Sequence, residues 1–226
     1  MNEVAKAEAR FSEAVALVQK RVPQFRTTFK EESRLHRAVG WVMAKLGAPD
    51  YMESLWTTLG YVMARPLVCR YGALPEEWRT VLHEGRHALD AKNTTRPLFY
   101  TQYSGPQSWF VPLAALALAA GSWAVAALAA LCLLPLPSLG RTWAELRGYQ
   151  VTLAAQVWYY GGTVGVDWVV DNFAGAQYYW MWPFRAWVRR RLENWVRAVY
   201  FDEAVLDPYL EDVRALALKY RAEDFG

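Results

Sequence analysis

Apolar residues recur every three to four positions in several stretches of the chain, which is the spacing of amphipathic helices. Residues 55–68 differ, because β-branched and aromatic residues there end near a proline and favour a strand. The pattern therefore predicts an α+β fold that is mostly α, with a small sheet. The expected helices cover residues 3–21, 31–46, 76–92, 141–160, 183–201 and 208–223.

No Lys, Arg, Asp or Glu lies between Arg96 and Arg141, and residues 110–134 are almost entirely apolar. A run of more than about 18 uncharged residues is long enough for a transmembrane helix. Gly121-Ser122 divides it, however, into two arms of roughly 10–12 residues that would reach only about 15–18 Å each. One span, a shallow re-entrant hairpin and a hairpin buried in the protein all fit this pattern.

Composition narrows the class of protein further. Hydrophobic residues make up 54% of the 226 residues and charged ones 21%, which excludes a disordered chain. The 25 Lys and Arg nearly balance the 22 Asp and Glu, so no nucleic-acid partner is expected. Only two cysteines are present, which excludes a disulfide framework. The acidic start has no signal peptide, so we expect a cytoplasmic or membrane-associated protein.

The clearest chemical signal is His-Glu-x-x-His on the helix expected over 76–92. Its spacing places His83 and His87 on one face of that helix, where both imidazoles can bind one Zn²⁺. Glu84 then lies beside the metal, where it can accept a proton from water. Two helical histidines can also form a packed or surface pair without a metal.

A catalytic zinc site normally has three protein ligands, so a third is expected downstream. No histidine follows His87, and Glu145 is the only acidic residue between Asp90 and Asp167. Glu145 is therefore the expected third ligand. The alternatives are a solvated ion pair of Glu145 with neighbouring arginines, or ligation by Asp167 or Asp171 instead.

The motif and the later glutamate resemble the gluzincin metallopeptidases, most closely their minimal, lethal-factor-type members. In those proteins the motif often extends to HExxHxxD, which Asp90 completes here, and an aromatic residue such as Tyr149 follows the late glutamate. The resemblance implies a zincin-like fold, zinc-dependent hydrolysis of a peptide or protein substrate, and an active-site strand at residues 56–64. Thr57-Thr58 and the sequence of residues 180–184 also resemble uncharacterised metallopeptidases of phage and prophage type.

The chain departs from the family pattern in the two middle positions of the motif. Gly85 weakens a helix by about 1 kcal/mol relative to alanine. Arg86 either pairs with an acidic residue away from the metal or lies close enough to disturb the site. We expect these two residues to affect the catalytic efficiency of the site more than its ability to bind a metal.

Two further residues are assigned roles with alternatives. Asp90 lies one turn beyond His87, where it can orient an imidazole, or it is simply a residue of the last helical turn. Tyr149 shares a helix face with Glu145, where it can donate to a developing oxyanion, or it belongs to the core.

Ligation by His87 and Glu145 also bears on the membrane question, because a single span between them would place them on opposite sides of a bilayer. We therefore prefer a re-entrant or buried hairpin at 111–134. We expect one domain over 1–226, with helices in 1–50, an apolar insert at 108–137 and aromatic and basic helices in 176–226. Membrane contact is expected through 110–134 and through the aromatic, arginine-rich residues 176–200.

The sequence thus predicts a zinc metallopeptidase that works at or on a membrane. One alternative is a non-catalytic structural or membrane-interaction protein, of phage origin, with a degenerate or structural metal site. Another is a small membrane-perturbing protein whose essential part is residues 111–134.

Overall fold

The computed structural model describes residues 3–45, 52, 57–59, 61–65, 77–105, 116, 119–123, 137–175 and 181–226. These residues are mostly helical and include a small sheet, which confirms the α+β class. The chain divides into two compact units, the first made of residues 1–92 with 206–226 and the second of 93–205. A single domain can contain two such units, so the expectation of one domain stays a prediction.

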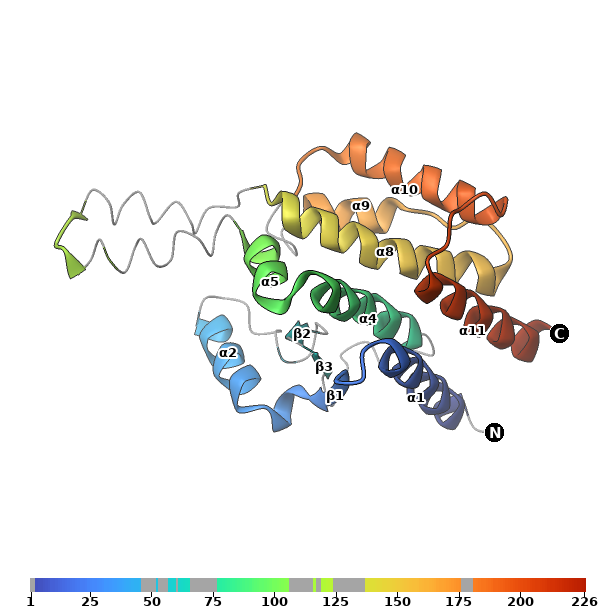
Figure 1. Cartoon of the computed structure of the whole chain (residues 1–226), viewed down its shortest axis with the longest axis horizontal. Coiled ribbons are helices and arrows are strands. Elements are labelled where there is room, and N and C mark those ends of the chain that lie inside the picture. The colour runs from blue at the N-terminus through green and yellow to red at the C-terminus, as the bar shows by residue number, and fades with distance from the viewer. Residues whose placement is uncertain are drawn as a thin grey trace. The chain divides into compact units, whose positions relative to one another are not determined.

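The first unit combines both ends of the chain. Its helices confirm those predicted over 3–21, 76–92 and 208–223. The helix predicted over 31–46 begins later, because its first residues form a separate 3-10 turn and Ser33 is extended. The elements, all but η1 labelled in Figure 1, are α1 (Glu3–Arg21), β1 (Arg26–Phe29), η1 (Lys30–Glu32), α2 (Arg34–Lys45), β2 (Thr57–Leu59), β3 (Val62–Arg65), α4 (Glu77–Thr94) and α11 (Pro208–Phe225).

The sheet has three strands in the order β1-β3-β2. β1 runs parallel to β3 and β2 antiparallel to it, and Leu59 pairs with Val62. The prediction of one strand across 55–68 is therefore wrong, and the role of 56–64 as an active-site strand stays a prediction. The chain reverses direction between two short strands, with Tyr61 in the turn.

Helices α1, α4 and α11 share the core of the first unit. Trp78 of α4 meets the ring of Tyr220 on α11 edge-on, with centroids 5.2 Å apart. Other fully or nearly fully buried side chains of this unit are Val18, Phe25, Met63, Leu82 and Tyr209. The aromatic contact fixes the C-terminal helix against the helix that carries the histidines.

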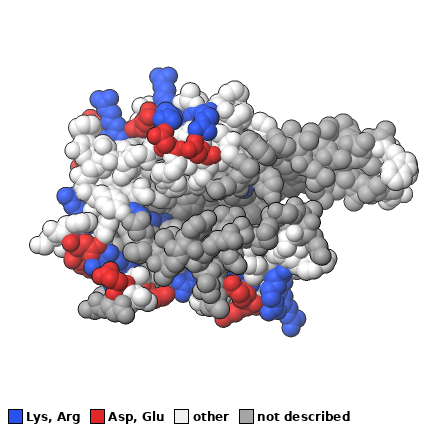
Figure 2. Space-filling model, turned by 180° about the vertical axis from the view of Figure 1, so that it is seen from behind, with Lys and Arg blue, Asp and Glu red and all other residues white. Residues whose placement is uncertain are grey.

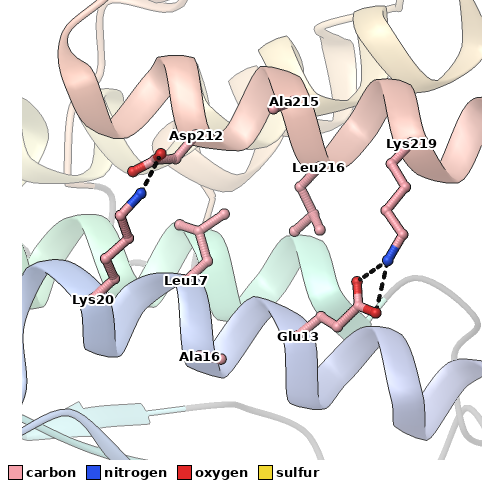
Figure 3. Close-up of a pocket in the computed structure, with 8 residues that line it drawn as sticks. All are labelled: Glu13, Ala16, Leu17, Lys20, Asp212, Ala215, Leu216 and Lys219. Carbon is pink, nitrogen blue, oxygen red and sulfur yellow. Dashed lines mark hydrogen bonds and ion pairs between the residues drawn. The ribbon is translucent and has the colours of Figure 1, made fainter.

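A shallow groove runs between α1 and α11, and Figure 3 shows ion pairs on either side of it. The Lys219 Nζ donates to both carboxylate oxygens of Glu13 at 2.8 Å, and Lys20 Nζ lies 3.0 Å from Asp212. Such exposed pairs contribute about 0–1 kcal/mol each, so apolar contacts stabilise this helix pair more. The groove is lined by Glu13, Ala16, Leu17, Lys20, Asp212, Ala215, Leu216 and Lys219.

Lys30 in η1 is fully buried, and this burial gives the first unit a pH dependence. Burial lowers the pKa of Lys30 from its ordinary value to about 8, although Glu31 opposes the change. Between that pKa and about 10.5 the unfolded chain binds a proton that the folded chain does not. The free energy of unfolding should therefore rise by about 3 kcal/mol as the pH passes through this interval.

Substituting Lys30→Met should remove this rise and stabilise the protein at pH 7 by about 2 kcal/mol, because a buried charge is replaced by an apolar chain. Urea unfolding of both proteins at pH 7 and pH 10 measures the difference. Lys20→Met, at a largely exposed lysine, is the control and should keep the pH dependence of the native protein. Parallel pH profiles for the native protein and Lys30→Met would contradict the prediction.

The second unit places α8 against α5 and α10, and α9 against α10. Its helices confirm those predicted over 141–160 and 183–201, whereas the short α5 and α9 were not predicted. Ser138 accepts from the backbone N–H of Arg141 at the start of α8, and Gly161 ends α8 in the left-handed region with φ 69°. The elements are α5 (Arg96–Ser104), α8 (Leu139–Tyr160), α9 (Asp167–Ala174) and α10 (Arg185–Tyr200).

Most of the apolar insert predicted at 108–137 lies outside the described residues, apart from 116, 119–123 and 137. Among the helices that the structure describes, none combines the length and the apolar character needed to cross a bilayer.

The aromatic and basic C-terminal helices expected at 176–226 divide between the units, since α10 belongs to the second and α11 to the first. Residues 176–180 lie outside the described part. In α10, Arg185 pairs with Asp171, and Arg189 pairs with Asp167. Figure 2 likewise shows basic and acidic side chains in mixed groups on the face it presents.

Candidate metal site

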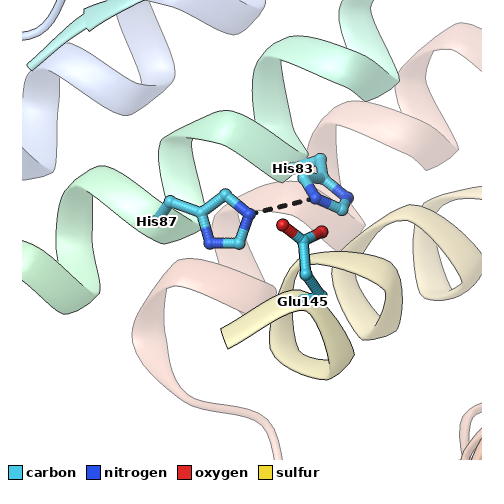
Figure 4. A group of neighbouring side chains, drawn as sticks. All are labelled: His83, His87 and Glu145. Atoms are coloured by element: carbon cyan, nitrogen blue, oxygen red, sulfur yellow. Dashed lines mark hydrogen bonds between the residues drawn. The ribbon is translucent and has the colours of Figure 1, made fainter. Parts of the chain in front are cut away.

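His83 and His87 lie one turn apart on α4 and point the same way (Figure 4). Their Nε2 atoms are 3.1 Å apart, and both side chains are buried. Two nitrogens bound to one tetrahedral zinc ion lie about 3.3 Å apart. The separation of the two imidazoles therefore fits two ligands of one ion.

Glu145 of α8 directs its carboxylate toward the two rings (Figure 4). One ligand atom from each of His83, His87 and Glu145 lies within 4.8 Å of the other two, and Glu145 is only 2% exposed. Two imidazole nitrogens and a carboxylate oxygen are a donor set that suits zinc. The structure thus brings together the three residues predicted as metal ligands, and the group could hold a metal ion.

Tyr103 is a site residue that the sequence did not indicate. Its hydroxyl, on α5, donates to Oε1 of Glu145, and the guanidinium of Arg141 lies over its ring, 5.4 Å from the centroid. A hydrogen bond of this kind orients a ligating carboxylate and leaves its other oxygen for a metal. Tyr103 could be found only from the packing of α5 on α8, because residue spacing along the chain does not show which helices pack together.

Glu84, the predicted base, is half-buried on α4 next to His83. Within the described parts of the chain it makes no hydrogen bond or ion pair. Its carboxylate is therefore not engaged in a structural contact there, which suits a group that must accept and release a proton.

Arg86 faces acidic residues of the first unit. Its Nε lies 3.2 Å from Oδ1 of Asp90, and its Nη1 donates to Asp207. Asp207 in turn caps α11 by accepting from the backbone N–H of Leu210 at 2.9 Å. Of the two positions considered for Arg86, the structure shows the one in which it pairs with acidic residues.

Burial and the contacts of this network shift the pKa values of the two carboxylates in opposite directions. Burial raises the pKa of Asp90, which is 3% exposed, and Arg86 only partly opposes that change. Burial also pushes the pKa of Asp207 upward, but hydrogen bonds from Arg86 and from two backbone N–H groups hold it below its usual value. Asp90 is thus placed beside Arg86, and its predicted role in orienting an imidazole stays a prediction.

Gly85 is explained by the helices that pack behind α4. A Cβ at this position would lie 2.4 Å from Cγ2 of Val18 on α1 and 2.6 Å from the hydroxyl of Tyr209 on α11. That hydroxyl donates to the backbone oxygen of Leu82 at 2.7 Å. The missing side chain therefore allows α1 and α11 to approach the helix that carries both histidines.

Substituting Gly85→Ala should lower the free energy of unfolding by up to about 2 kcal/mol, because an overpacking cost of about 1–3 kcal/mol outweighs the gain in helix propensity of about 1 kcal/mol. Urea unfolding measures the change. Gly162→Ala is the control, since nothing lies within 4 Å of a Cβ there, and it should change stability by less than about 0.5 kcal/mol. If Gly85→Ala were instead more stable than the native protein, Val18 and Tyr209 would have moved aside at little cost, which would contradict the prediction.

Tyr149 lies in the core of the second unit. Its hydroxyl accepts from Nδ2 of Asn172 at 3.1 Å, and its ring packs against Trp168 and Phe173. The side chain is 5% exposed. These contacts match the core position that the sequence left open, and the predicted donation to an oxyanion stays a prediction.

Asp167 and Asp171, the alternative ligands, do not belong to the metal-binding group among the described residues. Both lie on α9 and pair with arginines of α10. A comparison of the chain with protein-family models, with curated proteins and with solved structures finds no match. Any conclusion about function therefore rests on the site itself.

Proposed function

We propose that this protein is a zinc-dependent metallopeptidase that hydrolyses peptide bonds. The observation that carries the proposal is the buried group of His83, His87 and Glu145, with Glu84 adjacent to it on α4. This is the arrangement that the resemblance to gluzincins implies. A His-His-Glu donor set leaves a fourth position of a tetrahedral ion for water or substrate.

The residues of the chain have separate tasks in this proposal. His83, His87 and Glu145 hold the ion, which when bound supplies a Lewis acid for the substrate carbonyl and for water. Glu84 accepts the proton of the attacking water on its carboxylate and delivers it to the leaving amine nitrogen. Tyr103 positions Glu145 through its hydrogen bond to Oε1.

Zinc content tests the ligand assignment. Elemental analysis of protein purified without chelators should give one zinc per chain, and His87→Ala and Glu145→Ala should each lose it. His36→Ala is the matched control, because His36 is also buried but lies on α2 outside the group. Zinc that is absent from the native protein, or retained in Glu145→Ala, would overturn the assignment.

One observation favours a second function, a metal site that only stabilises the protein. All three donors are buried, with exposed fractions of 8% or less, and structural zinc sites are closed to solvent. The two functions differ in the expected effect of changing Glu84. A structural site would lose nothing in Glu84→Gln, whereas a peptidase would lose its activity and keep its zinc.

A further inference from the structure

The uncharged part of the chain, residues 97–140, lies within the second unit and includes no residue of the metal group. Its inner part, 106–137, contains only three polar side chains, Gln107, Ser108 and Ser122. A segment of this composition cannot be hydrated well by its own side chains. It requires either protein or lipid around it.

Both ends of this segment meet in the second unit. Ser138 donates its hydroxyl proton to the backbone oxygen of Gly105, and its backbone N–H donates to the oxygen of Met181 at 3.0 Å. A Cβ on Gly140 would lie 2.2 Å from the backbone oxygen of Gln102, so the start of α8 contacts the end of α5. The chain therefore leaves the second unit and returns to it at one place.

The chain turns at residues 120–121 of this segment, and large apolar side chains beside the turn are exposed. Gly121 has φ 68°, and the N–H of Ala120 donates to the oxygen of Leu116 at 3.0 Å. Leu116 is 67% exposed and Trp123 is 80% exposed. Most of the surface of both side chains is therefore open to their surroundings.

We propose that the turn at residues 119–123, together with Leu116, inserts into a lipid bilayer from one side. Tryptophan at the end of an apolar segment is typical of the membrane interface, where the ring is buried and its N–H reaches polar groups. A second copy of the chain is a poorer fit, because protein interfaces are rimmed by polar and charged groups that the uncharged segment lacks. The site needs no metal and stands independently of the proposed function.

The absence of charge on the segment sets a further expectation. Insertion driven by apolar side chains should be as strong for phosphatidylcholine vesicles as for vesicles with anionic lipid, and it should change little with salt. Binding through the arginines of α10 would instead require anionic lipid and weaken with salt. Two of those arginines, Arg185 and Arg189, already pair with acidic residues.

A fluorescent label at the turn tests the insertion directly. The protein with Cys69→Ser, Cys132→Ser and Ser122→Cys is labelled with an NBD dye and mixed with phosphatidylcholine vesicles. The emission should rise at least threefold and shift to the blue. The control carries Val205→Cys instead, because Val205 is 92% exposed but has Asp202 and Glu203 close by in sequence, and its emission should not change.

Leu116→Asp combined with Trp123→Asp should lower the vesicle partition coefficient at least tenfold without changing the unfolding midpoint, since both side chains are exposed. Three results would overturn the proposal. The first is an unchanged emission at position 122 when vesicles are added. The second is an emission change that occurs without lipid and depends on protein concentration, which would assign the turn to a second copy. The third is vesicle binding that needs anionic lipid and survives the two aspartate substitutions.

Discussion

Glu84→Gln should lower the rate of hydrolysis of a fluorescent casein substrate by about 10²–10⁴-fold, with one zinc still bound per chain. Glutamine keeps the size of the side chain but cannot accept the proton of the attacking water. Glu84 makes no structural hydrogen bond in the described parts of the chain, so the substitution should leave stability unchanged. Initial rates, measured beside elemental analysis of the same samples, separate loss of catalysis from loss of metal.

The matched control is Glu77→Gln in the first turn of the same helix. Glu77 pairs with Arg65 at 3.3 Å and is not part of the metal group, so full activity is expected. Undiminished activity in Glu84→Gln would exclude Glu84 as the base. A native protein that binds zinc but cleaves no substrate would instead favour the structural metal site.

Arg86→Met should lower the free energy of unfolding by about 3–5 kcal/mol, because it leaves two carboxylates of the network without their cation. Asp90 is 3% exposed and cannot be solvated by water, and Asp207 loses a charge-assisted hydrogen bond at the start of α11. Methionine fills much of the space of the arginine stem, so a cavity contributes little. Urea unfolding at neutral pH measures the change.

Arg185→Met is the control for a cation in an exposed pair. Arg185 and Asp171 have side chains that are 51% and 63% exposed, and removing such a pair should change stability by less than about 1 kcal/mol. If Arg86→Met were no more destabilised than Arg185→Met, the network behind the histidine helix would not be a stabilising one.

The three candidate ligands could be predicted from the sequence because the two histidines are close in sequence and because few carboxylates follow them. The two histidines are one helical turn apart, which any helix converts into a shared direction. Glu145 could be chosen because no other carboxylate lies between Asp90 and Asp167. Neither step required knowledge of how helices pack.

The residues that support the ligands could not be predicted, because their partners are distant in sequence. Tyr103 meets Glu145 across 42 positions, and Arg86 meets Asp207 across 121. From the sequence alone, Gly85 is expected only to weaken the helix, whereas the structure shows that α1 and α11 pack closely against it. Such contacts depend on tertiary packing, which helical periodicity does not encode.

The long amphipathic helices followed from the hydrophobic pattern, but short elements did not. β1 and β2 have four and three residues, too few to show an alternation, and α5 and α9 lack the repeated turns that make a helical stripe visible. The single strand expected at 55–68 is instead two strands with a turn at Tyr61, which the β-branched and aromatic residues around it did not indicate.

Because the Ser138 hydroxyl donates to the backbone oxygen of Gly105, we expect that another sequence can replace the apolar segment between these residues. Since its two ends already touch, a short glycine-serine linker can replace residues 106–137 without moving α5 or α8, which carry Tyr103 and Glu145. Closing so much shorter a loop costs about 2 kcal/mol less conformational entropy. The segment can therefore change in length or sequence while the residues of the candidate metal site stay as they are.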